Sequence, residues 1–135
     1  MIVYKDWGQH LRFGNWWFNY CALLTIAKRT GHQMQFPEYF AWKYMTHTPV
    51  IDEGIVPHET FPFRSNLYSR EEMDWLYQFF NDRKDLTINI NLGPNNQSEL
   101  WFQDELEYVK EQISFTTGAK DRVRDKYSNF FNRGT

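Results

Sequence analysis

The segment from residue 12 to residue 20 gathers residue types that bind anions. Arg12 carries a full positive charge, Gly14 lets the backbone approach a ligand closely or adopt a positive φ, and Asn15 can cap a helix or reach a sugar hydroxyl. With a strand before it and a helix after it, the free amides of the helix start and the positive end of its dipole would face the bound group. The segment is consistent with an anion site or with a simple capped turn. It lacks the three-glycine spacing of a dinucleotide-binding loop.

Other side chains with acid, base or metal chemistry are scattered. The four histidines lack the spacing of metal ligands, so we expect solvated or loop positions for them and predict no metal site: His10, His32, His47 and His58. One long loop holds two of these histidines and three carboxylates, which permits an acid/base role without specifying one: His47, Asp52, Glu53, His58 and Glu59. The sequence therefore assigns no catalytic residue.

A single cysteine, Cys21, excludes an internal disulfide and a multi-cysteine zinc site. It lies in an apolar run with helical spacing, which favours a buried, inert thiol over a nucleophile.

Aromatic residues are unusually frequent, at 19% of the chain: 12 Phe, 8 Tyr and 6 Trp. Such a surplus indicates a dense core, an aromatic-lined cleft or a surface that normally has a partner. Four of these residues form a candidate sugar-stacking surface, although core packing is the more common role for each: Trp16, Trp17, Tyr39 and Trp42. If the surplus belongs to an interface, the structure should show an exposed apolar patch.

The elements that must position these residues begin with a strand, a helix and a second strand. Residues 2–4 form a β-prone apolar run, a helix is expected from Asn15 to about Arg29 with Gly31 as its C-cap, and residues 33–36 alternate in polarity. Because the helix is apolar over much of its circumference, it should be buried on more than one side. This order predicts a right-handed βαβ unit with parallel strands.

The rest of the chain alternates loops, helices and one clear strand. Residues 46–68 read as a long irregular connection, residues 69–72 as a capping box that opens a helix to about Asn81, and residues 86–92 as a half-buried strand with its polar side chains outward. A helix after Ser98 should bury Phe102, Leu106, Val109 and Ile113. Gly118 should break the chain, with an amphipathic stretch from Asp121. We predict an α/β fold with a parallel sheet and flanking helices.

Length and charge limit the class of protein. The 135 residues fit one domain, and 15 basic against 17 acidic residues give a net charge of −2, which argues against a nucleic-acid partner. The first residues lack the apolar run of a signal peptide, and no segment approaches the roughly 18 apolar residues of a transmembrane helix. We expect a cytoplasmic protein, with peripheral association at the inner membrane left open.

Three stretches resemble one enzyme family. The run Arg12-Phe13-Gly14-Asn15, with Phe18, Tyr20 and the helix end 27–31, resembles the N-terminal motif of the α-1,2-fucosyltransferases, glycosyltransferase family 11. Residues 36–44 resemble its bacterial members, and residues 86–115 share a looser likeness in Gly93, Gln97-Ser98 and Trp101-Phe102. The chain departs from the motif at Leu11, Trp16 and Asn19.

The resemblance implies a fold, a reaction and a set of site residues. Residues 1–135 would form the N-terminal, acceptor-side, Rossmann-like lobe of a two-lobed, GT-B-like enzyme that transfers fucose from GDP-fucose to a galactose-type acceptor, with inversion and without a metal or other cofactor. Donor-binding residues would be His10, Arg12, Gly14, Asn15 and Trp16.

The family's second-half motif, His-x-Arg-Arg-Gly-Asp, does not occur in these residues. We therefore expect the C-terminal donor-binding domain to be absent from this chain and to be supplied by a missing lobe or a partner chain. Two alternatives stay open: a non-catalytic glycan-binding or interaction module, and an excised fragment of a longer enzyme.

Overall fold

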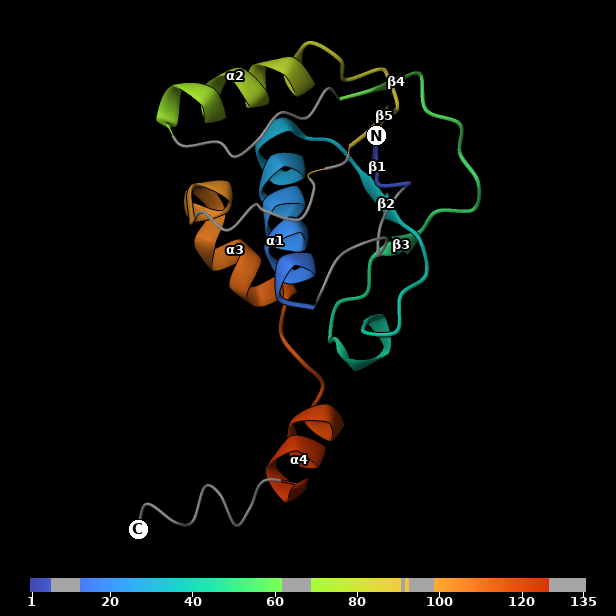
Figure 1. Ribbon diagram of the computed structural model, residues 1–135, viewed down its shortest axis with the longest axis vertical. Coiled ribbons are helices and arrows are strands. Elements are labelled where there is room, and N and C mark those ends of the chain that lie inside the picture. The colour runs from blue at the N-terminus through green and yellow to red at the C-terminus, as the bar shows by residue number, and fades with distance from the viewer. Residues whose placement is uncertain (6–12, 62–68, 91, 93–98, 127–135) are drawn as a thin grey trace.

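Parallel strand pairing organises the fold. The computed structural model describes residues 1–5, 13–61, 69–90, 92 and 99–126, with the side chains of 13–16 and 126 excepted (Figure 1). Its five short strands are β1 (Ile2–Val3), β2 (Met34–Phe36), β3 (Val50–Ile51), β4 (Glu59–Thr60) and β5 (Ile88–Asn89). They form one sheet in the order β3-β2-β1-β5-β4, and every pairing is parallel. The predicted α/β class with a parallel sheet is confirmed.

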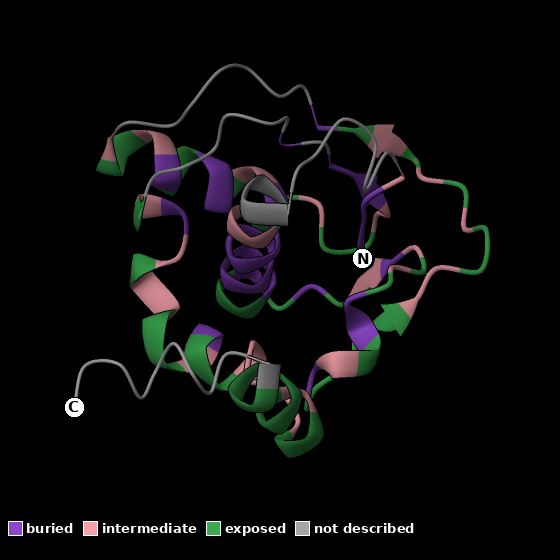
Figure 2. Ribbon diagram, turned by 60° about the horizontal axis from the view of Figure 1, so that its bottom comes forward, coloured by how far each residue is buried: buried purple, intermediate pink, exposed green. Residues whose placement is uncertain are grey.

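Helix α1 (Phe13–Thr30) connects β1 to β2 and forms the centre of the core. Every residue from Asn19 to Ala27 is buried, so the helix is covered on all sides, as its apolar circumference predicts (Figure 2). It begins at Phe13 and not at Asn15, so the expected capping role of Asn15 is wrong: this residue lies inside the first turn. Gly31 has φ 72°, the left-handed C-cap conformation that the sequence predicts.

Helices α2 (Arg70–Asn81) and α3 (Leu106–Gln112) pack on α1. The predicted capping box is present, since Ser69 Oγ accepts the N–H of Glu72 at 3.2 Å. Arg70 donates to both carboxylate oxygens of Asp104 at 2.5 and 2.6 Å, and Tyr77 donates to the same carboxylate at 2.7 Å. This junction joins the start of α2 to the 3₁₀ turn η3 (Gln103–Glu105), which leads into α3.

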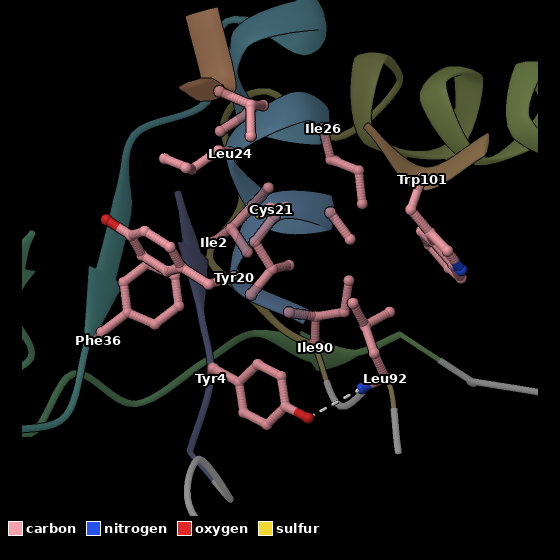
Figure 3. Close-up of a cluster of buried hydrophobic side chains, with 14 of the residues drawn as sticks. Ile2, Tyr4, Tyr20, Cys21, Leu24, Ile26, Phe36, Ile90, Leu92 and Trp101 are labelled. Atoms are coloured by element: carbon pink, nitrogen blue, oxygen red, sulfur yellow. Dashed lines mark hydrogen bonds between the residues drawn. The ribbon is translucent and has the colours of Figure 1, made fainter. Parts of the chain in front are cut away.

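The two faces of the sheet are covered differently. Ile2, Tyr4 and Ile90 belong to the same buried cluster as the side chains of α1 (Figure 3). Because side chains alternate along a strand, Val3, Gln35 and Asn89 face the other way. The connection 52–58 runs on that side, from β3 at one edge to β4 at the other (Figures 1 and 2). A right-handed connection that moves in the direction opposite to β1–α1–β2 must cross the opposite face.

Three expectations for local structure are wrong. The stretch 46–68 is not wholly irregular, because it holds both edge strands, β3 and β4. Strand β5 is not half-exposed: it pairs with β1 and β4, and Asn89 is buried on the face that the 52–58 connection crosses. Gly118 does not break the chain but lies inside α4 (Thr117–Lys126), a mostly exposed helix that projects from the rest of the protein (Figure 1).

The segment after Ser98 is also less helical than its pattern predicts. Two 3₁₀ turns, η2 (Glu99–Trp101) and η3, precede α3, which has only seven residues. Val109 is buried as expected, whereas Leu106 is exposed. The shift to 3₁₀ geometry rotates the later residues away from the face that an unbroken α-helix would bury.

The described aromatic residues divide between the core and the surface. Trp42, Trp101 and Phe80 are buried, whereas Phe40 and Trp75 are 61% and 54% exposed. Exposed apolar side chains of the described residues come from six different segments: Phe40, Val50, Val56, Trp75, Leu106 and Val123. Exposed apolar surface is thus present, and several elements contribute to it.

Gly31→Ala should lower the free energy of unfolding by about 1 kcal/mol, because alanine is disfavoured at positive φ while nothing nearby obstructs its Cβ. Urea unfolding monitored by circular dichroism measures the change. Gly118→Ala is the matched control: its Cβ also meets open space, but the backbone is helical, so stability should not fall. An equal loss in both variants would contradict the backbone explanation.

Candidate functional site

In a fold of this kind, a ligand is expected to bind at the carboxyl ends of the central strands. The chain leaves β1 towards β2 on one side, and it reaches β5, on the other side of β1, only after β4. In open α/β sheets, ligands bind at the carboxyl edge where connections diverge in this way. The chain that leaves β1 at this edge continues into α1, whose first turn holds Gly14 and Asn15 of the predicted anion motif.

A buried hydrogen-bond junction fixes α1 at the carboxyl edge. The hydroxyl of Tyr4, the residue after β1, accepts the N–H of Leu92 at 3.2 Å and a side-chain N–H of Asn19 at 3.4 Å (Figure 3). Asn19 is fully buried one and a half turns into the helix. The start of α1 is therefore held against the ends of β1 and β5.

A second junction at this edge joins β1, β5 and the 52–58 connection. Lys5 Nζ contacts Asp52 Oδ2 at 2.6 Å, and the backbone N–H of Lys5 donates to Asn89 Oδ1 at 2.9 Å. Asp52 Oδ1 accepts the N–H groups of Gly54 and Ile55 at 2.9 and 3.0 Å. Burial raises the pKa of Asp52, but the hydrogen bonds from Lys5, Gly54 and Ile55 outweigh it and leave the pKa below its ordinary value. Asp52 is thus an ionised structural carboxylate.

Two further acid/base candidates of the same loop, His58 and Glu59, also have structural partners. His58 Nδ1 accepts the N–H of Thr87 at 2.9 Å, and Glu59 pairs with Arg83. His58, Glu59 and Asp52 thus each have a structural partner.

The predicted donor-binding residues lie at the start of α1 or just before it. His10 and Arg12 are outside the described residues. Gly14, Asn15 and Trp16 lie in the first turns of the helix, and their side chains are likewise outside the described part. The first four N–H groups of a helix have no partner within it, so the backbone here retains the donors that an anion site needs.

An aromatic cleft of about 540 Å³ adjoins the same edge, where the chain leaves β2. Phe40 lies on Tyr39 with ring centroids 4.6 Å apart, and Tyr39 meets the edge of Trp42 at 5.9 Å. Trp42 Nε1 donates to the carbonyl of Pro37 at 3.0 Å, which fixes the turn. The cleft is lined by Glu38, Tyr39, Phe40, Trp42, Lys43, Thr48, Pro49 and Ile51.

The predicted sugar-stacking residues are only partly at this surface. Trp42 is 5% exposed, and Trp17 packs between Tyr20 and Phe115 at 6.0 and 5.7 Å, so both serve the core. Tyr39 is half-buried at the cleft. Phe40 has the most exposed ring of the described Phe, Tyr and Trp residues, and it was not among the predicted sugar-stacking residues. The sequence feature that could have indicated Phe40 is that residues 39, 40 and 42 are all aromatic. When Trp42 is buried, one of its aromatic neighbours is left at the surface.

Cys21 and His32 are structural residues. Burial raises the pKa of the Cys21 thiol to about 11, which confirms the expected inert thiol. His32 was expected in solvent but is buried: its Nδ1 lies 2.9 Å from the amino group of Met1, and its Nε2 lies 2.7 Å from the carbonyl of Phe80. Since a carbonyl only accepts, Nε2 carries the proton and Nδ1 accepts from Met1. Burial lowers the pKa of His32.

Two further features are absent from the described residues. No group of three histidine, cysteine or acidic side chains there lies close enough to hold a metal ion. No helix in the same part of the chain is long and apolar enough to cross a membrane.

Comparisons with protein-family models, with curated proteins and with solved structures found no match to this chain.

Acidification should destabilise the protein through His32. Its folded-state pKa lies below the ordinary value of about 6.5, so between these two values the unfolded chain binds a proton that the folded protein does not. Stability is therefore present above the unfolded pKa and is lost as pH falls towards the folded one. Urea unfolding from about pH 7 to about pH 5 should show this loss.

His32→Gln keeps one donor and one acceptor without a titrating ring, so it should flatten the pH dependence of stability over that range. His47→Gln, at an exposed histidine, is the control and should leave the slope unchanged. A parent slope retained in His32→Gln would show that another group causes the loss.

Asp52→Ala should lower the free energy of unfolding by about 2–3 kcal/mol, because it leaves the Lys5 ammonium and two backbone N–H groups without their acceptor. Asp74→Ala is the matched control. Asp74 also pairs with a cation, Arg70 at 2.9 Å, but its side chain is 61% exposed and the one of Asp52 only 6%. Equal urea midpoints for the two variants would contradict the structural role of Asp52.

Proposed function

We propose that this chain is the N-terminal, acceptor-side lobe of a two-lobed, GT-B-like glycosyltransferase. The lobe would serve an inverting, metal-independent transfer of fucose from GDP-fucose to a galactose-type glycan acceptor in the cytoplasm. One observation carries the proposal: the motif that resembles the α-1,2-fucosyltransferases spans the end of the β1–α1 connection and the start of α1, at the carboxyl edge of a parallel sheet.

The proposal gives each candidate residue a place around the donor. Arg12 and the amides at the start of α1, including those of Gly14 and Asn15, would face the donor sugar or its diphosphate. His10 and Trp16 would border the cleft. The junctions at Tyr4 and Lys5 support this arrangement, because they fix the strand end and the helix between which the motif runs.

The proposed reaction is a single displacement. An acceptor hydroxyl oxygen forms a bond to the anomeric carbon of fucose while the bond from that carbon to the diphosphate breaks. GDP leaves with the electron pair, and the hydroxyl proton passes to a base. Arg12 and the helix amides would stabilise the negative charge on the departing diphosphate, together with arginines of a second lobe. No described residue is assigned as the base.

The aromatic cleft favours a second candidate, a glycan-binding module without catalysis. An exposed ring at Phe40, with the carboxylate of Glu38, the ammonium of Lys43 and the hydroxyl of Thr48 around it, suits a sugar that stacks one face on an aromatic ring and hydrogen-bonds its hydroxyls. Sugar binding at this surface would require neither the motif that resembles the fucosyltransferases nor a nucleotide.

Calorimetric titration of the chain with GDP-fucose and with methyl β-galactoside tests both candidates. The transferase lobe predicts GDP-fucose binding that Arg12→Ala weakens by about tenfold, since a charge-assisted contact to the diphosphate is lost. Arg122→Ala removes an exposed arginine of α4 and is the control. In a complete enzyme that includes a second lobe, Asn15→Ala should reduce fucose transfer.

Galactoside binding without GDP-fucose binding would support the module instead. GDP-fucose binding that both arginine variants weaken equally, or full transfer by an enzyme carrying Arg12→Ala and Asn15→Ala, would refute the assigned donor residues.

A further inference from the structure

A second cleft, of about 640 Å³, adjoins the aromatic cleft and shares Thr48 and Pro49 with it. Its lining comes from the C-terminal half of α1, from Tyr108 and Gln112 of α3, and from the segment that leads into β3. No helix of the described residues covers this part of the sheet, because the connection from β2 to β3 contains only the 3₁₀ turn η1 (Trp42–Tyr44). We call this hollow the α1–α3 cleft.

The α1–α3 cleft has an apolar floor and a polar rim. The floor includes Leu24 and Ala27 from α1 and Met34 from β2. The rim consists of Lys28, Gln33, Gln35, His47, Thr48, Tyr108 and Gln112. A ligand that fits this cleft therefore has an apolar body and a polar end.

The charge of the rim is one-sided. Lys28 and His47 are basic or can become so, and the described residues that line the cleft include no aspartate or glutamate. The ammonium of Lys28 lies 5.0 Å from the ring of Tyr108, and in the described part of the chain it forms no ion pair. The neighbouring Arg29, by contrast, is paired with Glu105 at 3.7 Å. Among the described residues, no carboxylate thus neutralises the charge of the Lys28 ammonium in this cleft.

The rim also has hydrogen-bonding capacity to spare. Among the described residues, the side chains of Gln33, His47 and Gln112 make no hydrogen bond to one another or to the rest of the protein. Amide and imidazole groups so placed can donate to the oxygens of an anion. The negative end of the α1 dipole lies nearby and disfavours an anion at the helix terminus itself. We therefore expect the anionic group at the ammonium of the Lys28 side chain.

We propose that the α1–α3 cleft binds a small organic anion, with its carboxylate or phosphate group between Lys28 and His47 and its apolar body on the floor beside the Tyr108 ring. The inference is independent of fucose transfer, because it uses none of the residues of the carboxyl edge. Carboxylates and phosphates share the chemistry that this rim recognises, and the experiment separates them.

Titration of the full chain with phenyl phosphate, benzoate and the neutral benzyl alcohol, followed by ¹H–¹⁵N NMR, tests the proposal. One or both anions should shift the amide signals of Lys28, His47 and Tyr108 at concentrations up to about 10 mM, and the stronger ligand identifies the preferred head group. Lys28→Gln should weaken this binding by about tenfold, because a charge-assisted contact is lost.

Lys120→Gln is the control, since Lys120 is also an exposed lysine of a described helix, but it does not line this cleft. It should leave the affinity unchanged. The proposal is overturned if neither anion shifts these signals, if benzyl alcohol binds as tightly as the anions, or if the two lysine variants weaken binding equally.

Discussion

The burial of α1 on all sides is the constraint on which the rest of the structure depends. Its residues from Asn19 to Ala27 leave no face for water, so the sheet must cover one side and α2 and α3 the others. With the three helices on one side of the sheet, the opposite face is left to the 52–58 connection. Asp52 is buried and bonded there because a connection without regular structure needs such anchors to hold its position.

The fold was predictable where the signal is local. A capping box and apolar residues at helical spacing predict α2, and the length of the apolar run and Gly31 predict α1. The predicted ends of both helices lie within two residues of the observed ends. Strands β3 and β4 have two residues each and are defined by partners far away in sequence, which no local alternation reveals. Asn89 reads as a solvent-facing residue until the 52–58 connection is known to cross that face.

The candidate site shows the same division. Its place at the end of β1 follows from the strand, glycine and helix order of the first thirty residues. The junctions that fix it do not, because Lys5 and Asp52 are 47 positions apart and Tyr4 and Leu92 are 88 apart. His32 is a further example: a lone histidine near a helix end looks solvated, and only the fold brings the Met1 amine and the Phe80 carbonyl to its two nitrogens.

The aromatic surplus links the core to the surface. Trp42 lies 5.0 Å from Tyr20 of α1 and 5.6 Å from Phe36 of β2, and through Tyr39 it reaches the exposed Phe40. The surface ring therefore rests on rings that the buried helix holds in place. A ligand that stacked on Phe40 would meet a ring already packed against Tyr39, and such preorganisation lowers the entropic cost of binding. In this chain, dense aromatic packing and a preformed aromatic cleft are two consequences of one arrangement.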